Sequence, residues 1–282
     1  VLEPTPGNQT AKIAAALDKL SAGGSTNGGA GIRLAYNLAE QSFIKGGVNR
    51  VLLATDGDFN VGTTNFEALK QLVEEKRKTG IALTTLGFGT GNYNDHLMEQ
   101  VADAGNGNYS YIDTLSEARK VLVEEAGATL LTIAKDVKIQ VEFNPDVVSE
   151  YRLVGYENRM LKREDFNNDK VDAGEIGAGH TVTALYEITL KDSEGQRIDP
   201  LRYGKQKASR KVDAKELAFL RLRYKQPDEN KSRLIEKPLY VRDIQSTLAK
   251  TSANYRFSAA VAAFSQLLRG GQYTEQFDYA DV

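Results

Sequence analysis

The chain has 282 residues, a length that fits two domains of about 150 residues each. Hydrophobic residues make up 41% and charged residues 26%, which excludes disorder, collagen and a coiled coil as descriptions of the whole chain. The formal net charge of -2 provides no overall field that would select nucleic acid or an anionic membrane. Cysteine is absent and there are two histidines, so the sequence excludes disulfides, thiolate or histidine-rich zinc sites, and a cysteine nucleophile.

No apolar run approaches the ~20 residues that a membrane-spanning helix requires, so we expect no membrane span. The chain begins with Val1 rather than with a methionine or a signal peptide. We therefore expect a fragment or a processed form.

The first half of the chain alternates helical and strand-like patterns. Helices are expected at residues 10–20, 30–44, 65–79, 94–104 and 116–131, and strands at residues 50–55, 81–88 and 108–113. The first two strands are short, nearly continuous apolar runs, which are typical of parallel strands buried on both faces. Strands that alternate with helices imply crossover connections, so we predict a doubly wound, mostly parallel α/β domain over residues 1–132.

The second half, residues 133–282, has a different period. Apolar residues alternate with polar ones over residues 137–143, and further strands are expected at residues 147–155, 180–190 and 216–224. This pattern predicts a β-sandwich-like domain. A C-terminal amphipathic helix is expected at residues 254–268, with its apolar stripe packed against the β domain.

Two loops of the expected sheet carry candidate ligand residues. Asp56 directly follows the strand 50–55, and Thr26 lies in a Gly-rich loop just before a helix N-terminus. Ligands of doubly wound sheets bind beyond the carboxyl ends of the strands. One hydroxyl and one carboxylate there form half of a hard, all-oxygen site for Mg²⁺ or Mn²⁺. On spacing alone, a turn role for Asp56 and a helix-cap role for Thr26 stay open.

The segments Gly24–Thr26 and Leu53–Asp58 resemble the von Willebrand factor type A domain, a Rossmann-like fold. The resemblance implies a metal-ion-dependent adhesion site with Thr26 and Asp56 as ligands. Ser25 and Asp58 are adjacent candidates for the outer shell, and the match does not require Asp58. It implies Mg²⁺, with Mn²⁺ or Ca²⁺ as alternatives. The family's first motif, D-x-S-x-S, follows a strand that lies upstream of the point where this chain begins. Whether the metal site fills without that motif stays open.

A missing first strand would leave an apolar gap beside residues 50–55. Each uncovered strand residue costs about 1.5–3 kcal/mol, so we expect either preceding residues or a strand of another chain to fill the gap.

The segments 151–159 and 164–180 are similar to the C-terminal region of bacterial YfbK-type proteins. Those proteins join a von Willebrand type A domain to a β-rich extension of unknown activity. The resemblance covers nearly the whole chain and implies a location in the bacterial cell envelope. It implies a binding role and no reaction.

The expected function is therefore a metal-dependent, adhesion-type protein-binding module and not an enzyme. Thr26 and Asp56 would help to hold Mg²⁺, which would leave one coordination position for a carboxylate of a protein partner. One alternative is a metal-dependent hydrolase that uses Asp56 and Asp58, although the chain offers no histidine there as a general base. Another is a structural envelope-assembly module with an empty site.

Two weaker patterns favour structural explanations. The segment Asp165–Asp169 faintly suggests a calcium loop, but Lys170 and Ile176 stand where such a loop has Gly and Glu, so a hydrogen-bonded turn is expected. The stretch 205–225 is locally basic with few aromatic residues. It predicts a solvated strand face or loop rather than a nucleic-acid site.

Overall fold

The structure is a computed structural model that describes residues 2–21, 27–56, 66–89, 93–155, 160–191, 193, 195–198, 215–271, 273–274 and 277–282. The chain forms two compact units. The first unit consists of residues 1–133 and 174–180, and the second unit of residues 134–173 and 181–282.

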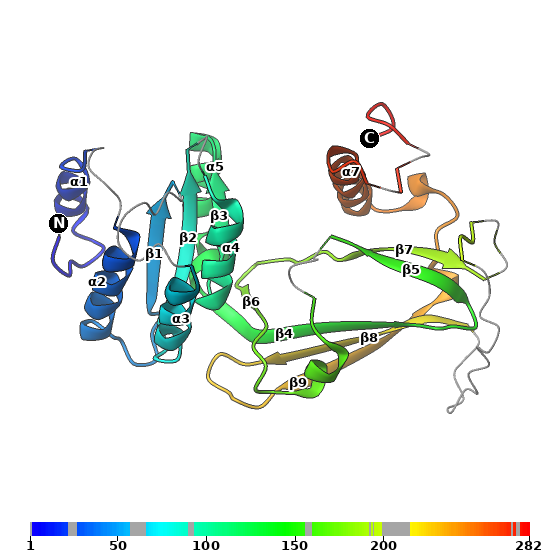
Figure 1. Cartoon of the computed structure of the whole chain (residues 1–282), viewed down its shortest axis with the longest axis horizontal. Coiled ribbons are helices and arrows are strands. Elements are labelled where there is room, and N and C mark those ends of the chain that lie inside the picture. Colours follow the sequence, from blue (N-terminus) through cyan, green and yellow to red (C-terminus); the bar gives the residue numbers. More distant parts are fainter. Residues whose placement is uncertain are drawn as a thin grey trace. The chain divides into compact units, whose positions relative to one another are not determined.

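A parallel three-stranded sheet forms the centre of the first unit, in the order β1 (Arg50–Thr55), β2 (Ala82–Phe88), β3 (Tyr109–Ile112) (Figure 1). The register pairs Val51 with Leu83 and Leu86 with Ser110. Parallel pairing places the carboxyl ends of all three strands at one edge. The predicted α/β class and the parallel sheet are confirmed.

Helices connect and flank these strands. They are α1 (Thr10–Leu17), α2 (Gly28–Gln41), α3 (Phe66–Arg77), α4 (Asp95–Ala104), α5 (Leu115–Arg119), a π-helix (Lys120–Glu124) and α6 (Ala126–Leu130). Three of them begin at side-chain caps: Asn27, Asn94 and Thr114 accept hydrogen bonds from backbone N–H groups of the first turn.

The single helix predicted at residues 116–131 is wrong. It is divided into α5, the π-helix and α6, because Glu125 leaves helical geometry with φ -99° and ψ 11°. Its N–H donates to the Lys120 carbonyl at 2.8 Å, which closes the π turn. Gly127, a weak helix former, lies two residues further on.

The core of the first unit lies on both faces of β2. On one face α2, α3 and α4 contribute a cluster that meets β1 and β2 (Ile32, Tyr36, Val51, Leu69, Val73, Ile81, Leu83, Val101, Ala104). On the other face Leu86, Ile112 and Val121 form a smaller cluster. The five central residues of β2 are buried, so the prediction of a strand buried on both faces is confirmed for β2.

For β1 that prediction is wrong. Val51 is buried, but Leu52, on the opposite face, is 48% exposed. The small cluster around Val121 covers that face at β2 and β3. Within the described residues, β2 is the strand that pairs with β1, so β1 lies at the edge of the sheet. That a further strand fills this edge stays a prediction.

The second unit contains two antiparallel sheets. The strands are β4 (Thr132–Phe143), β5 (Val148–Val154), β7 (Leu185–Leu190), β8 (Glu216–Lys225) and β9 (Arg233–Tyr240). The first two residues of β4, and the whole of β6 (Gly174–Gly177), belong to the first unit. The strand orders are β6-β4-β8-β9 and β5-β7. The sequence pattern missed β9, which carries several charges and Pro238. Proline is tolerated in β9 because this strand is at the edge of its sheet.

The two sheets meet through aromatic side chains. The Phe143 ring on β4 lies 4.6 Å from the Tyr151 ring on β5 and 5.4 Å from the Tyr186 ring on β7, measured between ring centroids. Such pairs contribute about 0.5–1.5 kcal/mol beyond the area that they bury. The sandwich-like class predicted for the second half is therefore confirmed.

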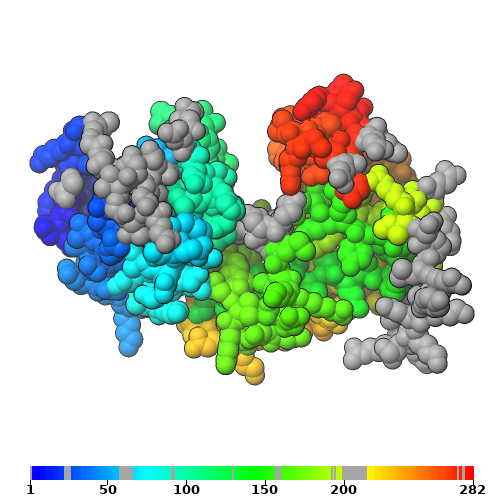
Figure 2. Space-filling model, viewed as in Figure 1, coloured from blue at the N-terminus to red at the C-terminus, as the bar shows by residue number. Residues whose placement is uncertain are grey.

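The C-terminal helix α7 (Ala253–Leu268) forms where the pattern predicts it, after the Ser252 cap. The expectation for its apolar stripe is wrong. No residue of α7, the segment coloured orange to red in Figure 2, is buried. Phe257 is 72% exposed. A different face, with Ala262, Ala263 and Gln266, lines a cavity with β5 and β7. Small side chains let a helix approach the sheet more closely than the aromatic stripe would.

The turn between α4 and β3 brings two backbones into close contact. A Cβ added at Gly107 would lie 1.7 Å from the Leu83 carbonyl oxygen on β2. We predict that Gly107→Ala destabilises the first unit by at least about 1–3 kcal/mol, because backbone must shift to admit the methyl group. Urea unfolding followed by circular dichroism measures this change.

The matched control is Gly31→Ala in α2, where a Cβ meets no atom within 4 Å. This change is expected to stabilise the helix by about 0.5–1 kcal/mol. Equal unfolding midpoints for the two variants would contradict the close packing of Gly107 on β2.

Candidate functional site

Asp56 lies at the carboxyl-end edge of the first unit's sheet. It follows β1 directly and its side chain is exposed. Gly89 follows the neighbouring strand β2, and a Cβ built on Gly89 would lie 3.8 Å from the Asp56 Cβ. Asp56 therefore stands beside the end of β2, as the parallel register requires.

Three tyrosines continue this edge from Gly89. The Tyr111 hydroxyl on β3 donates to the Gly89 carbonyl, and the rings of Tyr111 and Tyr93 lie 5.0 Å apart. The Tyr93 hydroxyl donates to the Tyr109 hydroxyl at 2.9 Å, and Tyr109 donates to the Asp95 carboxylate. We call Tyr93, Tyr109, Tyr111 and Asp95 the tyrosine cluster.

The sequence explains how this cluster forms. Tyr109 and Tyr111 are two residues apart on β3, so they share one face of the sheet. Gly87 of β2 provides room beside them, because a Cβ there would lie 1.8 Å from the Tyr93 hydroxyl oxygen. Sequence reasoning missed this cluster, although the Tyr-Ser-Tyr alternation at the end of a strand was a usable signal.

Burial is the main cause that raises the pKa of Tyr93 and of Tyr109, and the hydrogen bond to Asp95 raises the pKa of Tyr109 further. Both phenols therefore stay protonated at neutral pH and remain hydrogen-bond donors. The edge can thus offer a carboxylate at Asp56 and aromatic groups with polar ends beside it. Residues of this kind are enriched at protein interfaces.

The other predicted site residues, Ser25, Thr26 and Asp58, lie outside the described residues. The structure therefore brings Asp56 to the predicted edge, and the pairing of Asp56 with Thr26 stays a prediction. Among the described residues no group of three or more His, Cys, Asp or Glu side chains is arranged to hold a metal.

The segment that faintly suggests a calcium loop is a hydrogen-bonded turn. It overlaps a 3₁₀ helix, Arg163–Asn167, and its carbonyl groups accept hydrogen bonds from two lysines of the second unit. Lys138 Nζ donates to the carbonyls of Asp165 and Asn168, at 3.2 and 2.5 Å. Lys225 Nζ donates to the Asp169 carbonyl at 2.7 Å and forms an ion pair with Asp136. Two ammonium groups of the chain thus bind the oxygens that a bound cation would need.

Both lysines are nearly inaccessible to solvent, at 5% and 7% exposure. Burial lowers the pKa of Lys138. We predict that Lys225→Met lowers the free energy of unfolding of the second unit by roughly 1.5–3 kcal/mol, because the partly buried Asp136 loses the ion pair and hydrogen bond that Lys225 provides. Urea denaturation measures the loss.

Lys237→Met, on the exposed part of β9, is the control and is expected to change stability little. Added Ca²⁺ is expected to leave Lys225→Met unstable. Recovery of its stability in Ca²⁺ would show instead that the turn is a cation site.

The basic residues on β8 are paired within the second unit. Arg221 contacts Glu236 at 3.2 Å, and Arg223 lies 3.8 Å from Asp169. These strand residues therefore present little free positive charge to a nucleic acid, in line with the expected solvated strand face. The basic residues 205–211 lie outside the described residues.

Comparisons with known proteins agree with the two units. Residues 4–125 match the von Willebrand factor type A domain, and residues 128–282 match the family described as "Uncharacterized protein YfbK, C-terminal". The second match covers more than half of the chain. The chain therefore belongs to the YfbK family and carries a von Willebrand factor type A domain.

"Uncharacterized protein YfbK" of Escherichia coli (strain K12) is 51% identical over 277 residues, which are 98% of this chain and 47% of that protein. The chain thus spans about half the length of this relative. Inter-alpha-trypsin inhibitor heavy chain H3 of Mesocricetus auratus is 26% identical over 178 residues, which are 58% of this chain and 19% of the heavy chain.

Among solved structures, a von Willebrand factor type A protein from Catenulispora acidiphila aligns with 94% of this chain and 59% of its own, at 16% identity and a TM-score of 0.46. Over the described residues, no helix is long and apolar enough to cross a bilayer.

Proposed function

We propose that this member of the YfbK family is a non-catalytic protein-binding module of the bacterial cell envelope. In this proposal Thr26 and Asp56 help to hold Mg²⁺ at the carboxyl-end edge of the parallel sheet, with Ser25 and Asp58 in the outer shell. The metal binds a carboxylate of a protein partner. The observation that supports the proposal most directly is the exposed position of Asp56 next to Gly89 and the tyrosine cluster.

The chemistry of the donors fits a hard cation. Carboxylate and hydroxyl oxygens are ligands that Mg²⁺ accepts, and Mg²⁺ commonly keeps several waters when one or two protein groups hold it. When bound, the metal would supply positive charge that attracts an anionic partner. The tyrosine cluster would then contact the partner beside the metal, with aromatic faces and hydroxyl oxygens that can accept hydrogen bonds.

A binding role fits the surroundings of Asp56 better than catalysis does. A metal-dependent hydrolase needs a general base at the metal. Of the two histidines, His96 belongs to α4, where its ring contacts Gln100, and His180 lies in the segment after β6. Neither residue is part of the contacts described around Asp56 and Gly89.

The test uses Mn²⁺ as a paramagnetic probe of the full chain. We predict that Mn²⁺ broadens the amide NMR signals of Asp56, Gly89 and Tyr111, and that excess Mg²⁺ reverses the broadening. Asp56→Ala is expected to weaken Mn²⁺ binding by about tenfold or more, since it removes one charged ligand of a weak site.

Asp228→Ala is the matched control, because Asp228 is an exposed aspartate in the turn between β8 and β9 of the second unit. It is expected to leave Mn²⁺ binding unchanged. Broadening that persists in Asp56→Ala, or that is centred elsewhere, would refute the metal site at this edge.

A further inference from the structure

The second unit contains two adjoining cavities between β5, β7 and α7. The larger, of about 420 Å³, is lined by residues of β5 and β7, by residues 195–198 and by Tyr273. The smaller, of about 240 Å³, adds Val154, Ala262, Ala263 and Phe277. Four charged or aromatic residues, Arg152, Glu187, Arg197 and Tyr273, line both cavities.

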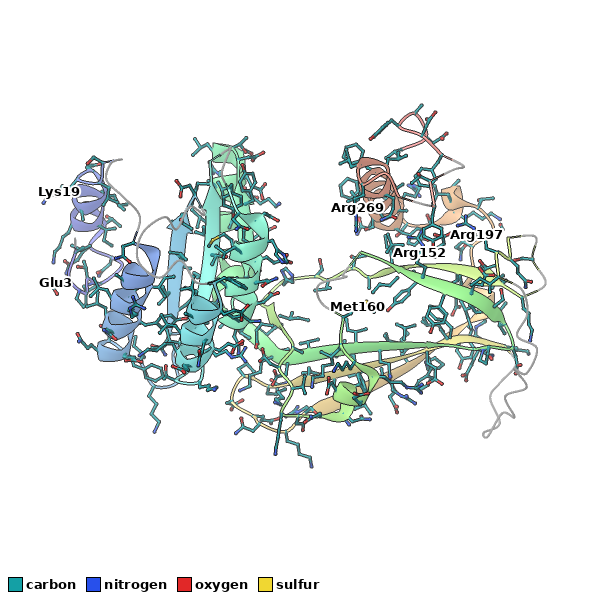
Figure 3. The ribbon with its side chains drawn as sticks, in the orientation of Figure 1. Glu3, Lys19, Arg152, Met160, Arg197 and Arg269 are labelled. Atoms are coloured by element: carbon teal, nitrogen blue, oxygen red, sulfur yellow. The ribbon has the colours of Figure 1, made fainter. Side chains whose placement is uncertain are left out.

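Two guanidinium groups lie over the same aromatic ring at this junction. The guanidinium carbon of Arg152 is 4.1 Å from the centre of the Tyr273 ring, and that of Arg197 is 5.0 Å from it. The two carbons are therefore at most about 9 Å apart. Figure 3 shows both arginines between the β5–β7 ribbon and α7.

The two arginines differ in their partners. Arg152 forms an ion pair with Glu187 and donates to the Gln266 side chain at 3.3 Å. In the part of the chain that the structure describes, the Arg197 guanidinium has the Tyr273 ring as its contact and no acidic side chain within ion-pair distance. Arg197 thus presents a planar set of N–H donors, which matches a carboxylate or a phosphate.

Glu150, a further charged residue that lines the larger cavity, fixes the backbone that carries Arg197. Its Oε1 accepts hydrogen bonds from the backbone N–H groups of Arg197 and Ile198, each at 2.8 Å. This carboxylate is therefore used to fix residues 197–198 at the cavity wall. The Glu150 carboxylate therefore positions Arg197 through its backbone and does not form an ion pair with its guanidinium group.

The smaller cavity has a different character. Val154, Ala262, Ala263 and Phe277 provide an apolar wall that begins at the charged junction. An oxyanion at Arg197 could thus carry an apolar substituent into this space, where each buried CH₂ group contributes about 0.8 kcal/mol in transfer free energy, or nearly fourfold in affinity.

We propose that these two cavities form one binding site for an organic acid, in which Arg197 binds the oxyanion and the wall of Val154, Ala262, Ala263 and Phe277 binds an apolar substituent. The Tyr273 ring holds Arg197 in place by stacking on its guanidinium group. The site belongs to the second unit and is independent of the metal site proposed for the first.

The test is an NMR titration of the full chain with hexanoate, hexyl phosphate, acetate and hexan-1-ol. Hexanoate or hexyl phosphate is expected to bind about tenfold or more tightly than acetate and hexan-1-ol, since only these two probes use both parts of the site. The tighter of the two identifies the oxyanion as carboxylate or phosphate. Signals of Arg197, Tyr273 and Ala263 are expected to shift.

Two variants divide the site. Arg197→Gln is expected to weaken hexanoate binding by about tenfold, as loss of a charged hydrogen-bond donor does. Arg242→Gln is its control, because Arg242 also stacks on a tyrosine, with its guanidinium carbon 4.5 Å from the centre of the Tyr240 ring, but lines neither cavity. Ala263→Leu fills the apolar part and is expected to reduce hexanoate affinity to that of acetate.

The proposal fails if hexan-1-ol binds as tightly as both acids. It also fails if Arg197→Gln and Arg242→Gln weaken hexanoate equally. Far-UV circular dichroism of each variant verifies that it is folded.

Discussion

Parallel pairing of three strands is the constraint on which the first unit depends. Because β1, β2 and β3 run in the same direction, the residues that follow them meet at one edge of the sheet. That pairing brings Asp56 beside Gly89, and it places Tyr111 within reach of the Gly89 carbonyl. Parallel strands must be joined by crossover connections, and the one between α4 and β3 passes close to Leu83 of β2. Glycines at this turn make the close approach possible, because they have no Cβ atom. Site and core are therefore consequences of one arrangement.

The sequence was sufficient for features that depend on local pattern. The strand positions of the first unit, the change of period near residue 133 and the helix at α7 all follow from the spacing of apolar residues. Asp56 was found because its position after an apolar run is itself a local signal. Conversely, β9 was missed because an edge strand with Pro238 and several charges lacks the apolar alternation of a half-buried strand.

Features that depend on contacts between distant segments could not be predicted. Leu52 on β1 is exposed because the cluster of Leu86, Ile112 and Val121 covers this face of the sheet at β2 and β3 but not at β1. The sequence of residues 50–55 contains no signal for this difference. The apolar stripe of α7 likewise predicted a buried face, but the sheet is approached by the small residues Ala262 and Ala263. Tyr93 can contact the tyrosines of β3 because Gly87, which has no side chain, leaves space for the Tyr93 hydroxyl. In each case a tertiary neighbour decides what the local sequence leaves undetermined.

Tertiary neighbours also divide the charged residues of the second unit into two kinds, those whose charge is paired within the fold and those whose charge is not. Lys138 and Lys225 are buried, and backbone carbonyls or Asp136 accept their hydrogen bonds, so their charges are used within the fold. Arg197 is exposed at a cavity, and the nearby Glu150 is engaged by backbone N–H groups instead. A buried charge with partners has a structural role, because its removal leaves an unpaired group behind. A charge that is held in position without an anionic partner can bind an external anion with little loss of conformational freedom. This difference, rather than the number of basic residues, is what distinguishes Arg197 from the paired cations of β8.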